Sequence, residues 1–169
     1  MTEPAPGLAL MRKLEAAFGR IERERMAGVP ILNPALRVAA IGIRPSGDAW
    51  VCALVTPWFI NLMVLPRTSE LAEAWMRDAA GAKVNHAFPA GTFEFICGGS
   101  EEELGPYRMC SLFSPVLQFE NQEAALAAGE AALAALFDEN LAAPETAGAS
   151  RKETQMSRRN LLFARAPRP

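Results

Sequence analysis

One stretch of the chain, residues 50–66, reads WVCALVTPWFINLMVLP and carries no charged residue. It holds two of the three tryptophans and is rich in β-branched and aromatic residues, which favour strands. We therefore expect two strands, residues 50–55 and 58–65, joined at Thr56 and Pro57. A membrane-spanning helix is disfavoured, because the run is shorter than the roughly 20 residues needed and a central proline costs a helix about 3 kcal/mol.

Both faces of this strand pair are mostly apolar, so neither face suits contact with water. Helices of the same chain can cover one face, which leaves the other for further protein. We predict that this second face binds a partner, because large exposed apolar patches mark interaction sites. Trp58, Phe59 and Met63 are the residues that we expect in contact with the partner. The alternative is a strand pair that the chain itself buries on both sides.

Around this pair the sequence predicts an α+β fold, a mainly antiparallel sheet flanked by an N-terminal and a C-terminal helix. Helical spacing of apolar residues occurs in residues 8–26 and 122–141, and a shorter helix capped by Ser69 is expected over residues 69–80. Further strands are expected at residues 36–44, 83–88, 92–97 and 107–113.

The composition changes near Ala142, which predicts a single domain over residues 1–141 and a flexible tail over residues 142–169. Six of the seventeen basic residues but two of the nineteen acidic residues lie in the tail. The tail therefore has a net charge of +4 and the body one of −6, so the tail can be attracted to the body. The acidic body argues against nucleic acid as a partner.

Residues with catalytic or metal-binding chemistry are few and scattered. Cys52, Cys97 and Cys110 form no C-x-x-C pair, which is typical of buried free thiols in a reducing compartment. His86 is the only histidine. No cysteine and no pair of carboxylates lies at a sequence spacing from it that is typical of a catalytic site. We expect no catalytic residue, no metal and no cofactor, and we expect a cytoplasmic location because the N-terminus lacks a secretory signal pattern.

Three consecutive acids, Glu101, Glu102 and Glu103, stand in a polar loop after Gly98. We predict that they attract basic groups of a partner protein. The alternative is an ordinary solvated turn, because exposed charges contribute little to stability.

Four segments carry a resemblance to a known family: residues 25–37 (RMAGVPILNPALR), 54–66 (LVTPWFINLMVLP), 88–95 (FPAGTFEF) and 110–115 (CSLFSP). In these the chain resembles the [NiFe]-hydrogenase assembly chaperones of the HybE/HupJ type. The resemblance implies a non-catalytic cytoplasmic chaperone that binds the precursor of the hydrogenase small subunit, whose twin-arginine export signal is a basic pair followed by an apolar stretch. Other hydrogenase accessory proteins are further possible partners. A small enzyme, redox-linked through Cys97 or Cys110, and another kind of protein-binding module remain as alternatives.

The tail contains Ser157-Arg-Arg-Asn-Leu-Leu162, in which Arg158, Arg159, Leu161 and Leu162 match a twin-arginine motif. The motif lies at the end opposite to an export signal and is followed by few residues, so we do not expect it to direct export. Two interpretations remain open. It is a chance match in a basic tail, or it mimics a signal and occupies the signal-binding site of this chain or of a neighbour.

Overall fold

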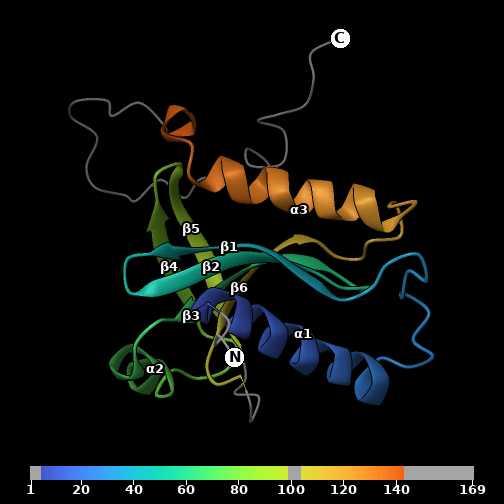
Figure 1. Ribbon diagram of the computed structural model, residues 1–169, viewed down its shortest axis with the longest axis horizontal. Helices are drawn as coiled ribbons and strands as arrows, with labels where there is room; N and C mark the ends of the chain where they lie inside the picture. Colours follow the sequence, from blue (N-terminus) through green and yellow to red (C-terminus); the bar gives the residue numbers. More distant parts are fainter. Residues whose placement is uncertain (1–4, 99–103, 143–169) are drawn as a thin grey trace.

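The structure, a computed structural model, describes residues 5–98 and 104–142, and its centre is one six-stranded antiparallel sheet (Figure 1). The strand order is β1-β2-β3-β6-β5-β4. The elements in chain order are α1 (Pro6–Arg25), β1 (Ala39–Ser46), β2 (Ala49–Val55), β3 (Ile60–Pro66), α2 (Ser69–Trp75), β4 (Lys83–Phe88), β5 (Gly91–Cys97), β6 (Arg108–Phe113), α3 (Gln122–Leu136) and the 3-10 helix η1 (Glu139–Leu141). The predicted α+β fold with a helix at each end of the sheet region is confirmed.

The charge-free stretch forms β2 and β3, which pair without interruption from Ala49 opposite Pro66 to Val55 opposite Ile60. Both faces of this pair are buried by the chain itself. Val51, Ala53 and Val55 belong to the core beneath α3, while Cys52 and Leu54 belong to the core beneath α1. Figure 1 shows α3 above the sheet and α1 below it. The strand pair is therefore the centre of the molecule.

Helix α1 covers one face of the sheet with the stripe that its sequence predicts, in which Leu14, Ala17 and Phe18 are buried. Proline at its first position suits a helix start, because the missing N–H has no partner there in any case. The chain leaves the helix after Met26 and turns at Gly28, whose φ of +77° favours glycine. Within the described residues, no helix is long and apolar enough to cross a bilayer.

Helix α2 is shorter than predicted and is capped by Thr68, not by Ser69, because the Thr68 Oγ1 accepts the Leu71 N–H at 3.1 Å. The helix ends at Trp75, and the residues that follow return to the sheet, where they form hydrogen bonds with the end of β5. The N–H of Gly81 donates to the Cys97 carbonyl, and the Cys97 N–H donates to the Ala82 carbonyl, both at 2.8 Å.

Helix α3 begins at the predicted cap, where the Asn121 Oδ1 accepts the Ala124 N–H at 2.8 Å. It stops at Leu136, five residues before the predicted end, and η1 follows with its own cap, Asp138. At Gly129 an added Cβ would lie 3.3 Å from the Ala53 Cβ, so the glycine allows α3 to approach the sheet closely.

Strand β1 starts at Ala39 rather than at residue 36, because the backbone N–H and carbonyl of Arg37 form hydrogen bonds with the Gln122 side chain instead of with a strand. The Gln122 Oε1 accepts the Arg37 N–H at 2.9 Å, and the Gln122 Nε2 donates to the Arg37 carbonyl at 3.1 Å. Further along, β1 carries a bulge between Ile41 and Arg44 that includes Gly42, with a φ of +68°.

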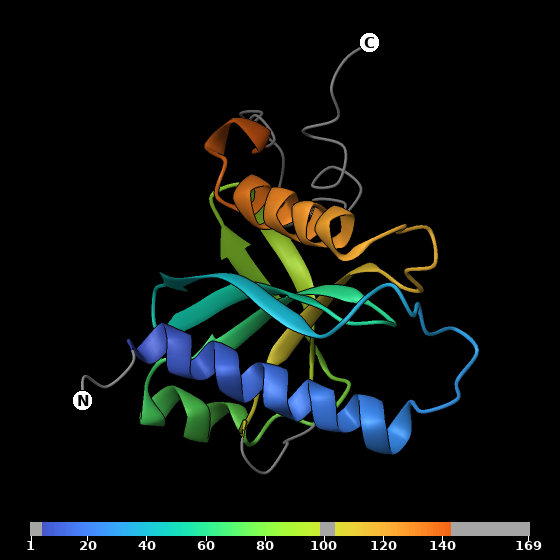
Figure 2. The same cartoon turned by 45° about the vertical axis from the view of Figure 1, so that its right-hand side comes forward.

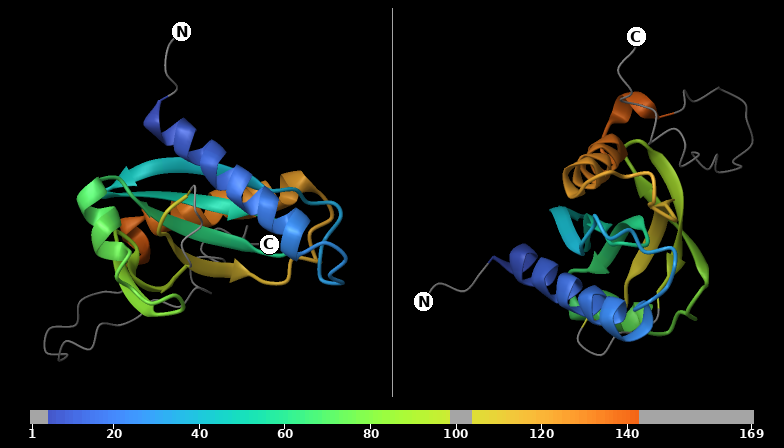
Figure 3. Two further views of the ribbon diagram at one scale, coloured as in Figure 1. Left: turned by 90° about the horizontal axis from the view of Figure 1, so that it is seen from below. Right: turned by 90° about the vertical axis from the view of Figure 1, so that its right-hand side faces the viewer.

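The two faces of the sheet are covered to different extents. Helix α1 runs along the sheet over β1–β3 (Figure 2). In the view from the side of α1, β6 is visible beside the helix (Figure 3, left panel). Among the described residues, the paired positions of β5 and β6 are Ile96 with Met109 and Cys97 with Arg108. In β5 the side chains of Phe93 and Phe95 are buried, whereas those of Glu94 and Ile96 are not. The part of this face formed by β5 and β6 therefore lacks the helical cover that β1–β3 have.

Candidate functional site

The turn between β2 and β3 is held by the hydroxyl of Thr56. Its Oγ1 accepts the N–H groups of Trp58 at 3.2 Å and Phe59 at 2.9 Å and donates to the Phe59 carbonyl at 3.1 Å. Pro57 suits such a turn, because its fixed φ is that of an early turn position. The sequence Thr-Pro-Trp-Phe, which carries much of the family resemblance, thus has a structural explanation.

Asn33 connects this turn to two other loops. Its N–H donates to the Pro57 carbonyl at 2.8 Å, and its Nδ2 donates to the carbonyls of Val116 at 2.9 Å and Phe119 at 2.8 Å. Its Oδ1 accepts the Ala35 N–H at 2.9 Å. A buried amide with all these bonds fixes the relative positions of three segments that are far apart in sequence.

Trp58 and Met63 are buried, with 8% and 0% of their surface exposed, and this corrects the expectation of an open apolar face at these residues. The cover comes from α1, whose Phe18 ring packs edge-to-face against Phe59 with 5.8 Å between the centroids. Phe59 itself is half-buried. Of the three predicted contact residues, only Phe59 reaches the surface, so a partner role for it remains a prediction.

An apolar strip does reach the surface beside α1, on strands that the sequence did not single out. Ile96 is 37% exposed, Met109 directly opposite it is half-buried, and Ser111 follows Met109 on the same face. We call the outer strip the three apolar residues Phe59, Ile96 and Met109 together with Glu94 and Ser111 beside them. Alternation along residues 92–97 does separate Glu94 and Ile96 from the buried Phe93 and Phe95, but it does not reveal that α1 stops short of them.

Asn61 lies next to the outer strip with an unsatisfied acceptor. The residue is 3% exposed, its Nδ2 contacts the Met109 Sδ at 3.5 Å, and its Oδ1 has no hydrogen-bond partner among the described residues. Leaving a buried acceptor unpaired costs about 1–3 kcal/mol. An amide kept at such a cost is a candidate for binding a donor from outside the chain.

The three predicted acids, Glu101, Glu102 and Glu103, lie outside the described residues, but the ends of their loop are placed. The loop follows β5 and precedes β6, and the Gly98 N–H donates to the Tyr107 carbonyl at 2.9 Å across its base. The pair Ile96 and Met109 is therefore close to the point from which the acidic loop leaves the sheet. The tail residues Arg158, Arg159, Leu161 and Leu162 also lie outside the described residues.

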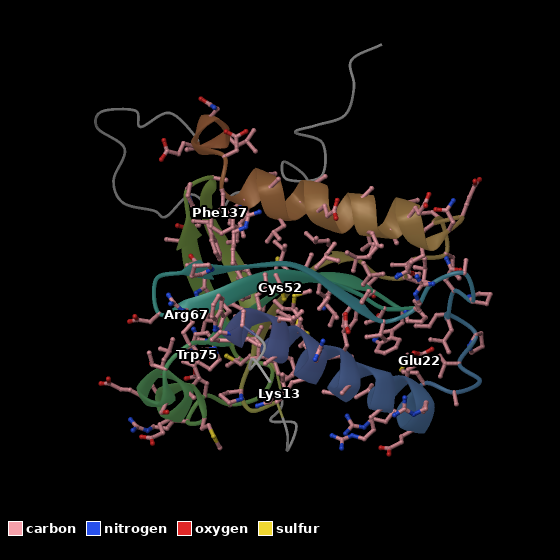
Figure 4. All side chains as sticks on the ribbon, in the orientation of Figure 1. Lys13, Glu22, Cys52, Arg67, Trp75 and Phe137 are labelled. Carbon is pink, nitrogen blue, oxygen red and sulfur yellow. The ribbon has the colours of Figure 1, made fainter. Side chains whose placement is uncertain are left out.

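All three cysteines are buried and none forms a disulfide, as the sequence predicts. Burial raises the pKa of the Cys52 thiol to about 12, because desolvation disfavours the thiolate. Cys52 lies between the sheet and α1 (Figure 4). Within residues 5–98 and 104–142, His, Cys, Asp and Glu side chains form no group of three that would hold a metal ion.

A polar cluster surrounds Arg108, on the sheet face opposite to the outer strip. The Arg108 Nη2 donates to Asp78 at 2.6 Å, its Nη1 lies 3.0 Å from the His86 Nε2, and its guanidinium stacks 4.0 Å from the Trp75 ring centroid. Because arginine only donates, His86 must be neutral and accept. Burial and the Arg108 charge together lower the pKa of His86 to about 4.

Comparison with known proteins identifies the family. A family model described as "[NiFe]-hydrogenase assembly, chaperone, HybE" matches residues 9–164. The chain belongs to the HybE family of hydrogenase assembly chaperones. The match includes the outer strip and the acidic loop, and it continues past the last described residue into the tail.

Relatives of this HybE-family chain agree with the assignment. Protein HoxT of Cupriavidus necator is 38% identical over 166 residues, which cover 92% of this chain and 88% of HoxT. Hydrogenase expression/formation protein HupJ of Bradyrhizobium diazoefficiens is 40% identical over 152 residues, covering 88% and 84%. The solution structure of HybE from Escherichia coli matches with a TM-score of 0.59 over 95% of this chain and 99% of that one, at 20% identity, and thus shares the fold.

The His86 cluster predicts a dependence of stability on pH. Between pH 6.5 and about pH 4 the unfolded chain binds a proton at His86 that the folded chain does not. The free energy of unfolding therefore falls as the pH decreases through this window. Urea unfolding at pH 7 and pH 5 should show a smaller loss for His86→Gln, which stays neutral and can still accept from Arg108. An equal loss in both proteins would show that His86 titrates normally in the fold.

Proposed function

We propose that this HybE-family chaperone binds the precursor of a hydrogenase small subunit through the outer strip and the adjoining acidic loop. The observation that carries the proposal is the position of exposed Ile96 beside Met109, next to the base of a loop that contains three glutamates. A twin-arginine signal presents a basic pair followed by apolar residues. An acidic loop next to an apolar strip complements both parts of such a segment.

The site is a binding surface rather than a reaction centre. Its residues are an aromatic ring, a methionine, an isoleucine, a serine and a carboxylate, and Glu94 is paired with Lys83 at 3.5 Å. Methionine suits the recognition of variable apolar segments, because its flexible side chain adapts to different partners. The redox-linked alternative has less support, because all three thiols are buried and burial opposes ionisation of Cys52.

Substitution of Ile96 by Ser tests the strip. Because Ile96 is 37% exposed, we expect little change in the free energy of unfolding and about a tenfold loss in affinity for a synthetic twin-arginine signal peptide, the size expected for removing an apolar anchor. The measurement is calorimetric titration with denaturant unfolding in parallel.

Two further variants make this test specific. Met76→Ser removes an apolar side chain that is 63% exposed at the end of α2, outside the strip, and should leave the affinity unchanged. Trp58→Ala should instead destabilise the fold by about 3–5 kcal/mol, as expected for emptying a buried aromatic site. Equal affinity of Ile96→Ser and the native chain would show that the client binds elsewhere.

Reversal of Glu101, Glu102 and Glu103 to Lys tests the electrostatic part. We expect slower association with the signal peptide and a flatter dependence on salt, because the loop no longer attracts the arginine pair. The matched control reverses Glu123, Glu130 and Glu139, which changes the net charge equally but lies in α3 and η1, on the other side of the sheet. Stopped-flow kinetics that change equally in both triple variants would attribute the effect to net charge alone.

A further inference from the structure

We infer that residues 157–162 of this chain occupy the outer strip of the same molecule and are displaced by the client. The inference rests on the proposed function of the strip and adds its regulation. The segment Ser157-Arg-Arg-Asn-Leu-Leu162 repeats the order of the expected client, a basic pair followed by apolar residues. A ligand and a tethered imitation of that ligand compete for one site.

The segment lies within the residues that the family model matches. The HybE family model matches residues 9–164, so its match continues 22 residues beyond Ala142, the last described residue, and includes both arginines and both leucines of the segment. The segment therefore belongs to the part of the chain that aligns with the family model.

Charge supplies an attraction between the segment and the body. Residues 143–169 contain six basic and two acidic residues, for a net charge of +4, and the rest of the chain has a net charge of −6. The client and the tail thus present the same sign of charge to the same acidic body. Such attraction acts over about 8–10 Å at physiological salt, so it favours a bound tail over a distant one.

The chain is long enough for the segment to reach the strip. Residues 143–156 separate Ala142 from Ser157, and a chain of that length spans up to about 50 Å when extended. A body of about 140 residues has a radius of gyration of about 14 Å, so a tether of this length extends most of the way around its surface. A tether of this kind gives an effective concentration near millimolar, which allows a segment of weak intrinsic affinity to block a site.

The unpaired acceptor oxygen of Asn61 could be satisfied by the segment, whose side chains are rich in hydrogen-bond donors. Its Oδ1 lacks a partner among the described residues, and its carboxamide lies against Met109 of the strip. Each arginine of the segment brings five N–H donors and no acceptor, and Asn160 brings two more donors. A shift of the flexible Met109 side chain would bring a donor to this oxygen.

Full-length variants test the inference by calorimetric titration with the twin-arginine signal peptide at low salt. Arg158→Glu together with Arg159→Glu should release the strip and tighten peptide binding about tenfold, the gain expected if the tail binds with a Kd near 0.1 mM at an effective concentration near 1 mM. The matched control, Arg165→Glu together with Arg168→Glu, changes the net charge equally but leaves the motif intact, and should tighten binding much less. Equal affinity of the native chain and both double variants would overturn the inference.

A second titration separates failure of this inference from failure of the proposed function. A free peptide of residues 156–169 is added to the full-length Arg158→Glu, Arg159→Glu chain, alone and with Ile96→Ser. Saturable binding that Ile96→Ser weakens supports self-occupation, whether or not the client peptide binds. Absence of binding, or binding unaffected by Ile96→Ser, overturns it. A native chain that is dimeric by light scattering, with the Arg158→Glu, Arg159→Glu chain monomeric, would also overturn it, because the tail would then bind a neighbour.

Discussion

The structure depends on a pair of strands, β2 and β3, whose two faces are both apolar and must both be covered. Strands β2 and β3 are buried on both sides, and every residue from Val51 to Trp58 is buried. Two helices from opposite ends of the sequence supply the cover, α1 on one face and α3 on the other. The sheet, α1 and α3 thus depend on one another, because exposing either face would leave a large apolar surface in water.

This constraint also determines where a binding surface can lie. Helix α1 is needed over β1–β3, and there its Leu14 and Phe18 cover Cys52, Leu54 and Met63. The same face of β5 and β6 is left beside the helix, where Ile96 and Met109 meet. The surface available to a partner therefore lies on β5 and β6, beside α1, and not on the central strands that α1 covers.

Short-range patterns predicted the fold well. Strand β4 has the predicted bounds, and β5 differs by one residue, because alternation and the intervening Pro89-Ala-Gly91 turn signal are both local. The early ends of α2 and α3 were not predictable in the same way. Each depends on long-range contacts, such as the bonds of Gly81 and Cys97 that return the chain to the sheet. The late start of β1 has the same kind of cause, since Gln122 holds the Arg37 peptide from across the molecule.

The candidate site was harder to predict than the fold. The sequence motif around Trp58 is conspicuous because a turn and a core require it, and its prominence suggested a contact surface that α1 in fact covers. Ile96 and Met109 are ordinary residues in ordinary strands. Their exposure follows from where α1 crosses the sheet, which depends on packing and not on any local pattern.

Hydrogen–deuterium exchange of the chain with and without the full small-subunit precursor tests the central claim most directly. Binding at the outer strip predicts slower exchange in residues 92–97 and 108–111 and unchanged exchange in α3, which covers the opposite face. Protection confined to α3, or to α2 and β4, with residues 92–97 and 108–111 unaffected, would contradict the account.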